Sequence, residues 1–219
     1  EVHGIIVAGP PAGAPAGAEF RDRFGPTLAF HGVRIVDGGP EHRWQSVQAA
    51  LAEIPEEATH VAVHDAARPA VDDGLLDRVF AAARQHPAVI PAVPVADTLK
   101  RAGEPEVLAP DGAADRLADA ILGDAGRADV TVRRVLETVA RDGLRAAQTP
   151  QVFVTSLLRR AFAEADPEGV TDDADLIQRL GEPVLMVDGS STNVKVTIPS
   201  DLPLVRAILG SMPRRPATL

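Results

Sequence analysis

The sequence predicts an α/β fold: a mostly parallel, open β-sheet with helices on both faces. Short runs of β-branched and small apolar residues alternate with stretches of helical periodicity, and this alternation is typical of strand–helix–strand units. The chain of 219 residues is 45% apolar, which is enough to build a real core. Polar residues follow several of the apolar runs directly, at the edge of the sheet where such folds bind ligands.

The pattern places each element in order along the chain. The predicted strands are Gly4–Ala8, Val33–Val36, His60–His64, Val89–Val95, Leu144–Ala147, Val184–Val187 and Val194–Thr197. The predicted helices are Trp44–Ile54, Gly74–His86, Ser156–Ala165, Asp172–Leu180 and Leu202–Leu209. Of these, His60–His64 in the stretch "THVAVHDAARP" is expected to be a buried strand because its residues are small or β-branched.

One stretch interrupts the alternation. Residues 98–138 are rich in Gly, Ala and Asp, with a short helical pattern near Asp115–Leu122. Their flanks, Asp97–Ala102 and Val132–Val139, read as the two strands of a hairpin, and such a projection is typical of a lid or a dimerisation arm. We therefore expect one α/β domain formed by residues 1–96 and 145–219, and a protruding arm at 97–144 that serves as a lid or for dimerisation.

Charge and composition exclude several classes of function. The net charge of −9 argues against a protein that binds duplex nucleic acid by neutralising phosphates. The chain has no cysteine, which excludes disulfides, a thiol nucleophile and a thiolate zinc site. No apolar run approaches the roughly 18 residues of a membrane span, and the amino terminus lacks the basic segment of a signal peptide. We expect a cytoplasmic protein that binds no nucleic acid or membrane.

Lysine is scarce. The basic residues are almost all arginine, and Lys100 and Lys195 are the two lysines of the sequence. Compositional bias is the main explanation. An ammonium is nevertheless a compact charge that arginine replaces poorly where one cation must meet one phosphate oxygen. Lys195 is therefore a candidate for such a role, whereas Lys100 reads as a surface residue.

Two strand ends carry candidate ligand contacts. Gly38 and Gly39 in "VDGG" would let the backbone approach a base or phosphate, although an ordinary turn explains them better. Asp65 in "HDAARP" is a natural Mg²⁺ ligand, and Arg68 could face an anion held by that metal. An ion pair between Asp65 and Arg68 that caps the next segment explains the spacing equally well. His64 reads as a packed or hydrogen-bonded residue.

Five motifs occur in an order that resembles one enzyme family. "VHDAARP", "DTLKRA", "TVARDGLRAAQTPQVF", "TDDADLI" and "NVKVTIPSDL" are similar to the motifs of the 2-C-methyl-D-erythritol 4-phosphate cytidylyltransferases, over nearly the whole chain. The resemblance implies a nucleotide-diphospho-sugar transferase-like, Rossmann-like fold and Mg²⁺-dependent transfer of CMP from CTP to a sugar-alcohol phosphate. This reaction releases pyrophosphate and belongs to isoprenoid precursor synthesis.

The resemblance also implies roles for individual residues. Asp65 matches the family's metal ligand, and Lys195 matches the lysine at the α-phosphate of CTP; these two are the catalytic candidates. The residues that match contacts to the cytosine or ribose are Gly38, Gly39, Ser46 and Ala66. The residues that match contacts to methylerythritol phosphate are Arg68, Thr98, Arg141 and Thr171. In the family, Arg141 on the arm reaches the site of the neighbouring subunit, so the resemblance implies a homodimer formed through the arm.

Two departures from the family pattern keep alternatives open. The Gly-rich loop with Arg and Lys that wraps the CTP triphosphate in the family is not visible; "IIVAGPPAGAPAGAEFRDRFG" instead fits the family's second strand and its Pro-rich loop. We therefore expect further residues upstream of Glu1. In addition, "GGPEHRWQSV" has one residue more than usual between the glycines and Ser46, which leaves the roles of Arg43 and Ser46 open. The alternative functions are transfer to another polyol phosphate, such as ribitol 5-phosphate, and a non-catalytic homologue.

Overall fold

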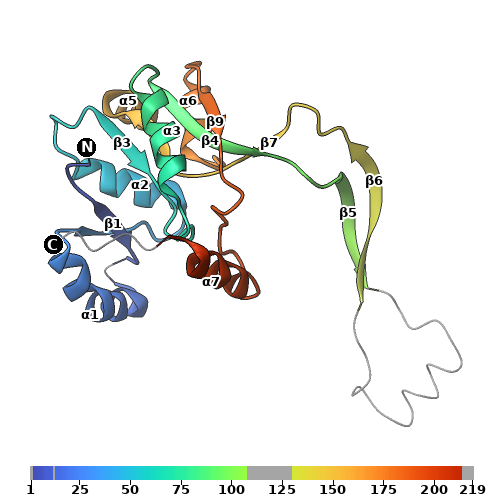
Figure 1. Cartoon of the computed structure of the whole chain (residues 1–219), viewed down its shortest axis with the longest axis horizontal. Coiled ribbons are helices and arrows are strands. Elements are labelled where there is room, and N and C mark those ends of the chain that lie inside the picture. The colour runs from blue at the N-terminus through green and yellow to red at the C-terminus, as the bar shows by residue number, and fades with distance from the viewer. Residues whose placement is uncertain (1, 12, 108–129, 214–219) are drawn as a thin grey trace, which may run out of the picture. The chain divides into compact units, whose positions relative to one another are not determined.

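The computed structural model describes residues 2–11, 13–107 and 130–213 (Figure 1). The chain divides into two compact units, of which the first comprises Glu1–Val93 with Ala147–Leu219 and the second Pro94–Ala146. The boundaries predicted at residues 96 and 145 lie within a few positions of these. The helical pattern predicted at Asp115–Leu122 falls outside the described residues.

The first unit contains two sheets. In the central sheet, four strands lie side by side in the order β3 (His60–Val63), β8 (Gln151–Val154), β4 (Ala88–Pro94) and β9 (Leu185–Asp188). The strand β8 is antiparallel to both β3 and β4, while β9 is parallel to β4. The strands β1 (Ile6–Gly9) and β2 (Arg34–Asp37) pair in parallel in a separate sheet. The predicted α/β class is confirmed, and β8 runs opposite to β3, β4 and β9.

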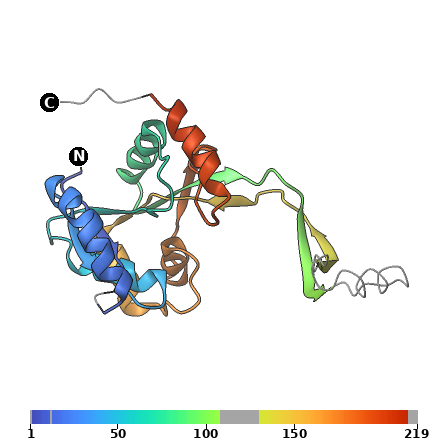
Figure 2. The same ribbon diagram turned by 90° about the horizontal axis from the view of Figure 1, so that it is seen from below.

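Helices cover both faces of the central sheet. The strand β4 has the apolar sequence AVIPAVP and is buried over most of its length. Because successive side chains of a strand point to opposite faces, Ala88 and Ile90 pack with α5 (Thr155–Glu164) and α6 (Asp173–Arg179), whereas Val89 packs with α3 (Asp73–Ala83). Figure 2 shows α3 on one side of the sheet and α5 and α6 on the other.

The helix α3 shows how sequence sets this packing. Leu75, Val79 and Ala83 recur every fourth residue and are all buried, so they form one apolar stripe against the sheet. The helix starts at an Asp72 cap, whose Oδ1 accepts a hydrogen bond from the Leu75 N–H at 2.7 Å. Both signals are local, and the predicted helix Gly74–His86 overlaps the observed one.

The observed secondary structure differs from the predicted one at four places. The helix α1 (Pro15–Phe30) was not predicted, because its apolar residues show little periodicity; Pro15 suits its first turn, where no N–H donor is required. The strand β8 was also not predicted. The predicted strand Val194–Thr197 has no strand pairing, and the Val196 N–H donates to the Ala67 carbonyl instead. The strand β3 alternates between exposed and partly buried residues, since it lies at a sheet edge.

Two helices complete the first unit. The helix α2 (Arg43–Ala52) follows β2, and Leu51 on α2 joins the core on the side of α5 and α6. The helix α7 (Asp201–Ser211) begins where the Asp201 carboxylate accepts hydrogen bonds from the backbone N–H groups of Thr197 and Ile198. These bonds hold the pKa of Asp201 below its ordinary value.

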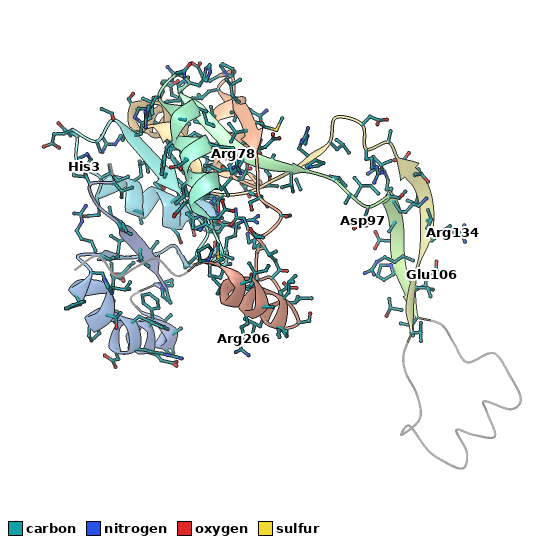
Figure 3. All side chains as sticks on the ribbon, viewed as in Figure 1. His3, Arg78, Asp97, Glu106, Arg134 and Arg206 are labelled. Atoms are coloured by element: carbon teal, nitrogen blue, oxygen red, sulfur yellow. The ribbon has the colours of Figure 1, made fainter. Side chains whose placement is uncertain are left out.

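The second unit is a hairpin. Its strands β5 (Leu99–Val107) and β6 (Thr131–Val139) pair antiparallel, close to the two predicted flanks. Lys100 Nζ donates a cross-strand hydrogen bond to Thr138 Oγ1 at 2.6 Å, as suits an exposed surface lysine. Figure 3 shows Glu106 and Arg134 on this hairpin. The short strand β7 (Arg145–Ala147) follows as the chain returns to the first unit.

Among residues 2–11, 13–107 and 130–213, no helix combines the length and the apolar character that crossing a bilayer requires.

Phe153 should be the residue of β8 on which the core depends most. Its side chain is fully buried among residues of α5 and α6, so Phe153→Ala should lower the free energy of unfolding by about 3–5 kcal/mol. Phe30→Ala is the matched control, because Phe30 is 85% exposed and its loss leaves no cavity. Chemical denaturation of both variants checks this, and equal effects would contradict the assigned core.

Candidate active site

Loops from two strand ends and one helix start meet around a cavity. The loop after β3 carries Asp65 and Arg68, the segment after β9 carries Lys195, and Thr171 stands just before α6. The cavity has a volume of about 230 Å³. It is lined by Arg43, Asp65, Arg68, Ala147, Gln148, Thr149, Gln151, Thr171, Asp172 and Lys195. Four of the predicted site residues, Asp65, Arg68, Thr171 and Lys195, are therefore brought together.

Asp65 lies between cations. Its Oδ2 is 2.9 Å from Lys195 Nζ and its Oδ1 is 2.9 Å from Arg43 Nε, while Arg68 Nε is 3.9 Å from Oδ2. Burial by itself raises the pKa of the Asp65 carboxyl, but the hydrogen bonds from Lys195 and Arg43 outweigh burial and hold this pKa below its ordinary value. The carboxylate is therefore kept ionised at neutral pH.

A hydroxyl group fixes the backbone of the Asp65 loop. Thr149 Oγ1 accepts the Asp65 N–H at 3.0 Å and lies 3.1 Å from His64 Nδ1. His64 Nε2 lies 3.0 Å from the Arg68 carbonyl oxygen, which can only accept. His64 in its neutral form thus carries its proton on Nε2 and accepts at Nδ1 from the Thr149 hydroxyl. This agrees with the prediction of a hydrogen-bonded His64.

Arg68 is held by backbone carbonyls. Its Nη1 donates to the Asn193 carbonyl at 2.8 Å and its Nη2 to the Ala147 carbonyl at 3.4 Å. Asn193 is itself fully buried and donates from Nδ2 to the Thr149 carbonyl at 2.8 Å. Since Asn193 lies two residues before Lys195, one buried residue connects the Thr149, Arg68 and Lys195 segments, through its side chain to Thr149 and through its backbone carbonyl to Arg68. The predicted ion pair between Asp65 and Arg68 is present but long, and carbonyls supply the shorter contacts.

The segment before α6 forms the opposite wall. Asp172 caps this helix through the Asp175 N–H at 2.9 Å and accepts from Gln151 Nε2 at 2.7 Å. Asp173 is almost fully buried, and its Oδ2 accepts from Arg43 Nη1 at 2.8 Å. Burial raises the pKa of the Asp173 carboxyl above its ordinary value, against the opposing charge of Arg43.

The glycine pair next to α2 has a packing explanation. A Cβ at Gly38 would lie 2.4 Å from the Gly9 carbonyl oxygen, and one at Gly39 would lie 2.0 Å from the Gln45 Cβ. The Gly39 N–H donates to Ser46 Oγ at 3.1 Å. Close packing between β1 and α2 therefore requires both glycines, whether or not a base also lies on them. Ala66, the fourth predicted nucleotide contact, follows Asp65 and is exposed.

Thr98 and Arg141 belong to the second unit. Thr98 directly precedes β5, and Arg141 lies just after β6, where its Nη1 donates to the Ala96 carbonyl. Both are exposed. The two residues flank the end of the hairpin at which Leu99 of β5 pairs with Val139 of β6. Their roles as substrate contacts stay predictions.

The side chains around Asp65 limit which metal ion this site could bind. In the part of the chain that the structure describes, no three acidic or histidine side chains come together as a metal cage. Asp65 offers its carboxylate to the cavity. This arrangement suits Mg²⁺, which takes one or two carboxylates and completes its shell with phosphate oxygens and water. Both oxygens of Asp65 are paired, with Arg43 and with Lys195, so a metal ion would have to take the place of one of these contacts.

The structure adds residues that sequence reasoning had left without a role. Arg43, Thr149 and Gln151 all line the cavity and hydrogen-bond to other residues of its wall. Thr149 and Gln151 lie within the quoted motif "TVARDGLRAAQTPQVF", so the motif was the available signal. Arg43 was obscured by the unusual spacing after the glycines.

In an α/β fold, a cavity lined by charged loops at strand ends is the usual place for a ligand to bind. Comparison with known proteins gives the family. A model of the 2-C-methyl-D-erythritol 4-phosphate cytidylyltransferase (IspD) family matches residues 1–118 and 113–211, so the chain belongs to this family. The resemblance seen in the motifs is thereby confirmed.

Individual relatives agree. The chain is similar to 2-C-methyl-D-erythritol 4-phosphate cytidylyltransferase of Frankia casuarinae, at 41% identity over 94% of this chain and 64% of that protein. It is equally similar to that of Symbiobacterium thermophilum, at 41% identity over 81% and 64% of the two chains. The crystal structure of the Thermus thermophilus enzyme matches with a TM-score of 0.60 at 37% identity, over 81% and 73% of the two chains.

A crystal structure of a 4-diphosphocytidyl-2C-methyl-D-erythritol synthase matches with a TM-score of 0.69 at 32% identity. That match covers 95% of this chain and 82% of the other. The chain spans slightly less than two thirds of the length of the two curated relatives above.

The low pKa of Asp65 predicts an acid-sensitive contribution to stability. Because folding lowers this pKa, the ionised Asp65 stabilises the fold above the unfolded-state pKa of about 3.9, and that contribution is lost as the pH falls through the folded-state value. In Asp65→Asn, the free energy of unfolding should therefore change less between about pH 5 and pH 3 than in the wild type. Denaturation at several pH values checks this, with Asp97→Asn at an exposed position as control. Equal pH slopes in all three proteins would contradict it.

Proposed function

We propose that the protein is a cytidylyltransferase that transfers CMP from CTP to 2-C-methyl-D-erythritol 4-phosphate, releasing pyrophosphate, in isoprenoid precursor synthesis. The observation that supports this most is the shared cavity of Asp65, Arg68, Thr171 and Lys195 in a chain of this family. These are the positions at which the family motifs require metal, nucleotide and acceptor contacts.

The reaction joins two anions. An oxygen of the acceptor phosphate attacks the α-phosphorus of CTP, a new P–O bond forms, and the bond from that phosphorus to the bridging oxygen of pyrophosphate breaks. The acceptor phosphate is already deprotonated, so no strong general base is needed. The protein's contribution is positioning and charge neutralisation. This suits a cavity lined by cations that can meet the phosphates of both substrates.

The cavity residues can divide this work. Lys195 is 41% exposed at the side chain and projects its ammonium into the cavity, where it would neutralise the α-phosphate. Arg68, fixed by the carbonyls of Asn193 and Ala147, would face the phosphates with little loss of side-chain entropy. Thr171 would donate its hydroxyl to the acceptor from the opposite wall.

The proposal includes Mg²⁺ held by Asp65. When bound, such an ion would neutralise the phosphate oxygens of CTP and favour departure of pyrophosphate. Both oxygens of Asp65 are paired, with Arg43 and with Lys195, so Asp65 would hold the ion through Oδ2 once Lys195 turns to the α-phosphate.

Two further parts of the proposal rest on the sequence and the family resemblance. We propose that the second unit, which carries Thr98 and Arg141, makes the protein a homodimer in which each arm completes the neighbouring site. We also propose that the protein acts in the cytoplasm and binds neither nucleic acid nor membrane.

Direct assay of the purified protein tests the main proposal. With CTP, Mg²⁺ and 2-C-methyl-D-erythritol 4-phosphate, pyrophosphate should be released, and chelation by EDTA should abolish this release. Ribitol 5-phosphate in place of the methylerythritol compound should give little product. Turnover with ribitol 5-phosphate alone would move the proposal to the other acceptor, and no turnover with either would favour the non-catalytic homologue.

Lys195→Arg should lower kcat by about 100-fold or more, because a guanidinium cannot place one compact charge at the α-phosphate. Lys100→Arg is the matched control, since Lys100 lies on the hairpin and donates its hydrogen bond to Thr138. Steady-state kinetics of both variants checks this. A Lys195→Arg enzyme with wild-type kcat would show that the position is structural.

A further inference from the structure

We propose that Arg43 is a positioning residue of the active site, which holds Asp65 and the segment Thr171–Asp173 in their working geometry. This inference rests on the proposed function and adds a residue to it. Arg43 acts through the two carboxylates that it binds.

The contacts of Arg43 join three separate parts of the chain. Its Nε donates to Asp65 Oδ1 at 2.9 Å and its Nη1 donates to Asp173 Oδ2 at 2.8 Å. Arg43 is the first residue of α2, Asp65 lies in the loop after β3, and Asp173 is the first residue of α6. One planar group thus fixes the distance between the two loops that face each other across the cavity.

The backbone below Arg43 is itself held in place. Gln45 Oε1 accepts from the N–H groups of Glu41 and His42, at 3.1 and 3.0 Å. Ser46 Oγ accepts from the Gly39 N–H. The loop that contains the additional residue before α2 is therefore closed by side chains of α2, and the start of this helix has a defined direction. This gives the guanidinium a fixed base from which to reach both carboxylates.

The chemistry of the site makes this position matter. Asp65 Oδ2 faces Lys195, so the orientation set at Oδ1 by Arg43 also decides where Oδ2 and the ammonium lie. Asp173 follows Thr171 by two residues, so the same guanidinium also sets the wall that carries this threonine. A shift of Arg43 would therefore displace groups assigned to the nucleotide and to the acceptor together.

Arg43 also balances a buried charge, and this effect must be separated from positioning. The Asp173 side chain is 2% exposed, so loss of Arg43 leaves a buried carboxylate without its cation and should destabilise the fold. Replacing both partners by neutral amides removes that penalty. The double variant should then regain stability without regaining the arginine contact to Asp65.

The experiment compares Arg43→Gln, Asp173→Asn and the double variant Arg43→Gln/Asp173→Asn with the wild type. Arg160→Gln is the matched control, because Arg160 pairs with Glu182 at the exposed surface. For each protein, Tm is measured by circular dichroism, the affinity for CTP in the presence of Mg²⁺ by calorimetry, and kcat and KM by pyrophosphate release.

Arg43→Gln should lower Tm and weaken the affinity for CTP. It should also lower kcat by about 100-fold, because a small displacement of the reacting groups has this effect. In the double variant, Tm should rise back toward the wild-type value while kcat stays about 100-fold low and the affinity for CTP stays weakened. Arg160→Gln should leave kcat unchanged.

Recovery of Tm and kcat together in the double variant would overturn the proposal, since Arg43 would then act only as a counter-charge for Asp173. Wild-type kcat in Arg43→Gln would overturn it as well. A wild-type protein that gives no turnover refutes the proposed function, and the role of Arg43 falls with it. If the wild type turns over and either of the first two results is found, the proposed function stands and only the role of Arg43 is refuted.

Discussion

The site depends on one carboxylate held between two cations. Asp65 accepts from Arg43 at one oxygen and from Lys195 at the other, and its backbone N–H is held by the hydroxyl of Thr149. A half-buried carboxylate without partners would be destabilising or protonated. Here Arg43 and Lys195 keep the carboxylate ionised, and without them the orientation of the Asp65 side chain in the cavity would not be fixed. The charges of the site are therefore mutually dependent.

The fold brings these partners together at strand and helix ends. Lys195 follows β9, Thr149 precedes β8, and Arg43 starts α2, so each segment enters the cavity from a different element. Buried amides then fix the segments to one another. Asn193 joins the Thr149 and Arg68 segments, and Gln151 joins β8 to the cap of α6. Buried polar groups that are hydrogen-bonded in this way give a site a single arrangement.

Much of the fold could be predicted because its signals are local. The stripe of Leu75, Val79 and Ala83 and the Asp72 cap suffice to predict α3. The weak periodicity after Pro15 concealed α1, and the run around Lys195 resembled a strand although its backbone finds no strand partner. The strand β8 is short and its direction is decided by pairing with β3 and β4, which no local pattern encodes.

The sequence by itself determined the α/β class, the family and the identity of the charged residues, because composition, periodicity and motif order are properties of the chain. Asp65, Arg68, Thr171 and Lys195 could be named in this way. The tertiary structure decided that these four share one cavity and that Arg43 joins Asp65 to Asp173. Such contacts depend on how distant segments pack, and the distance between two side chains is not written in their separation along the chain.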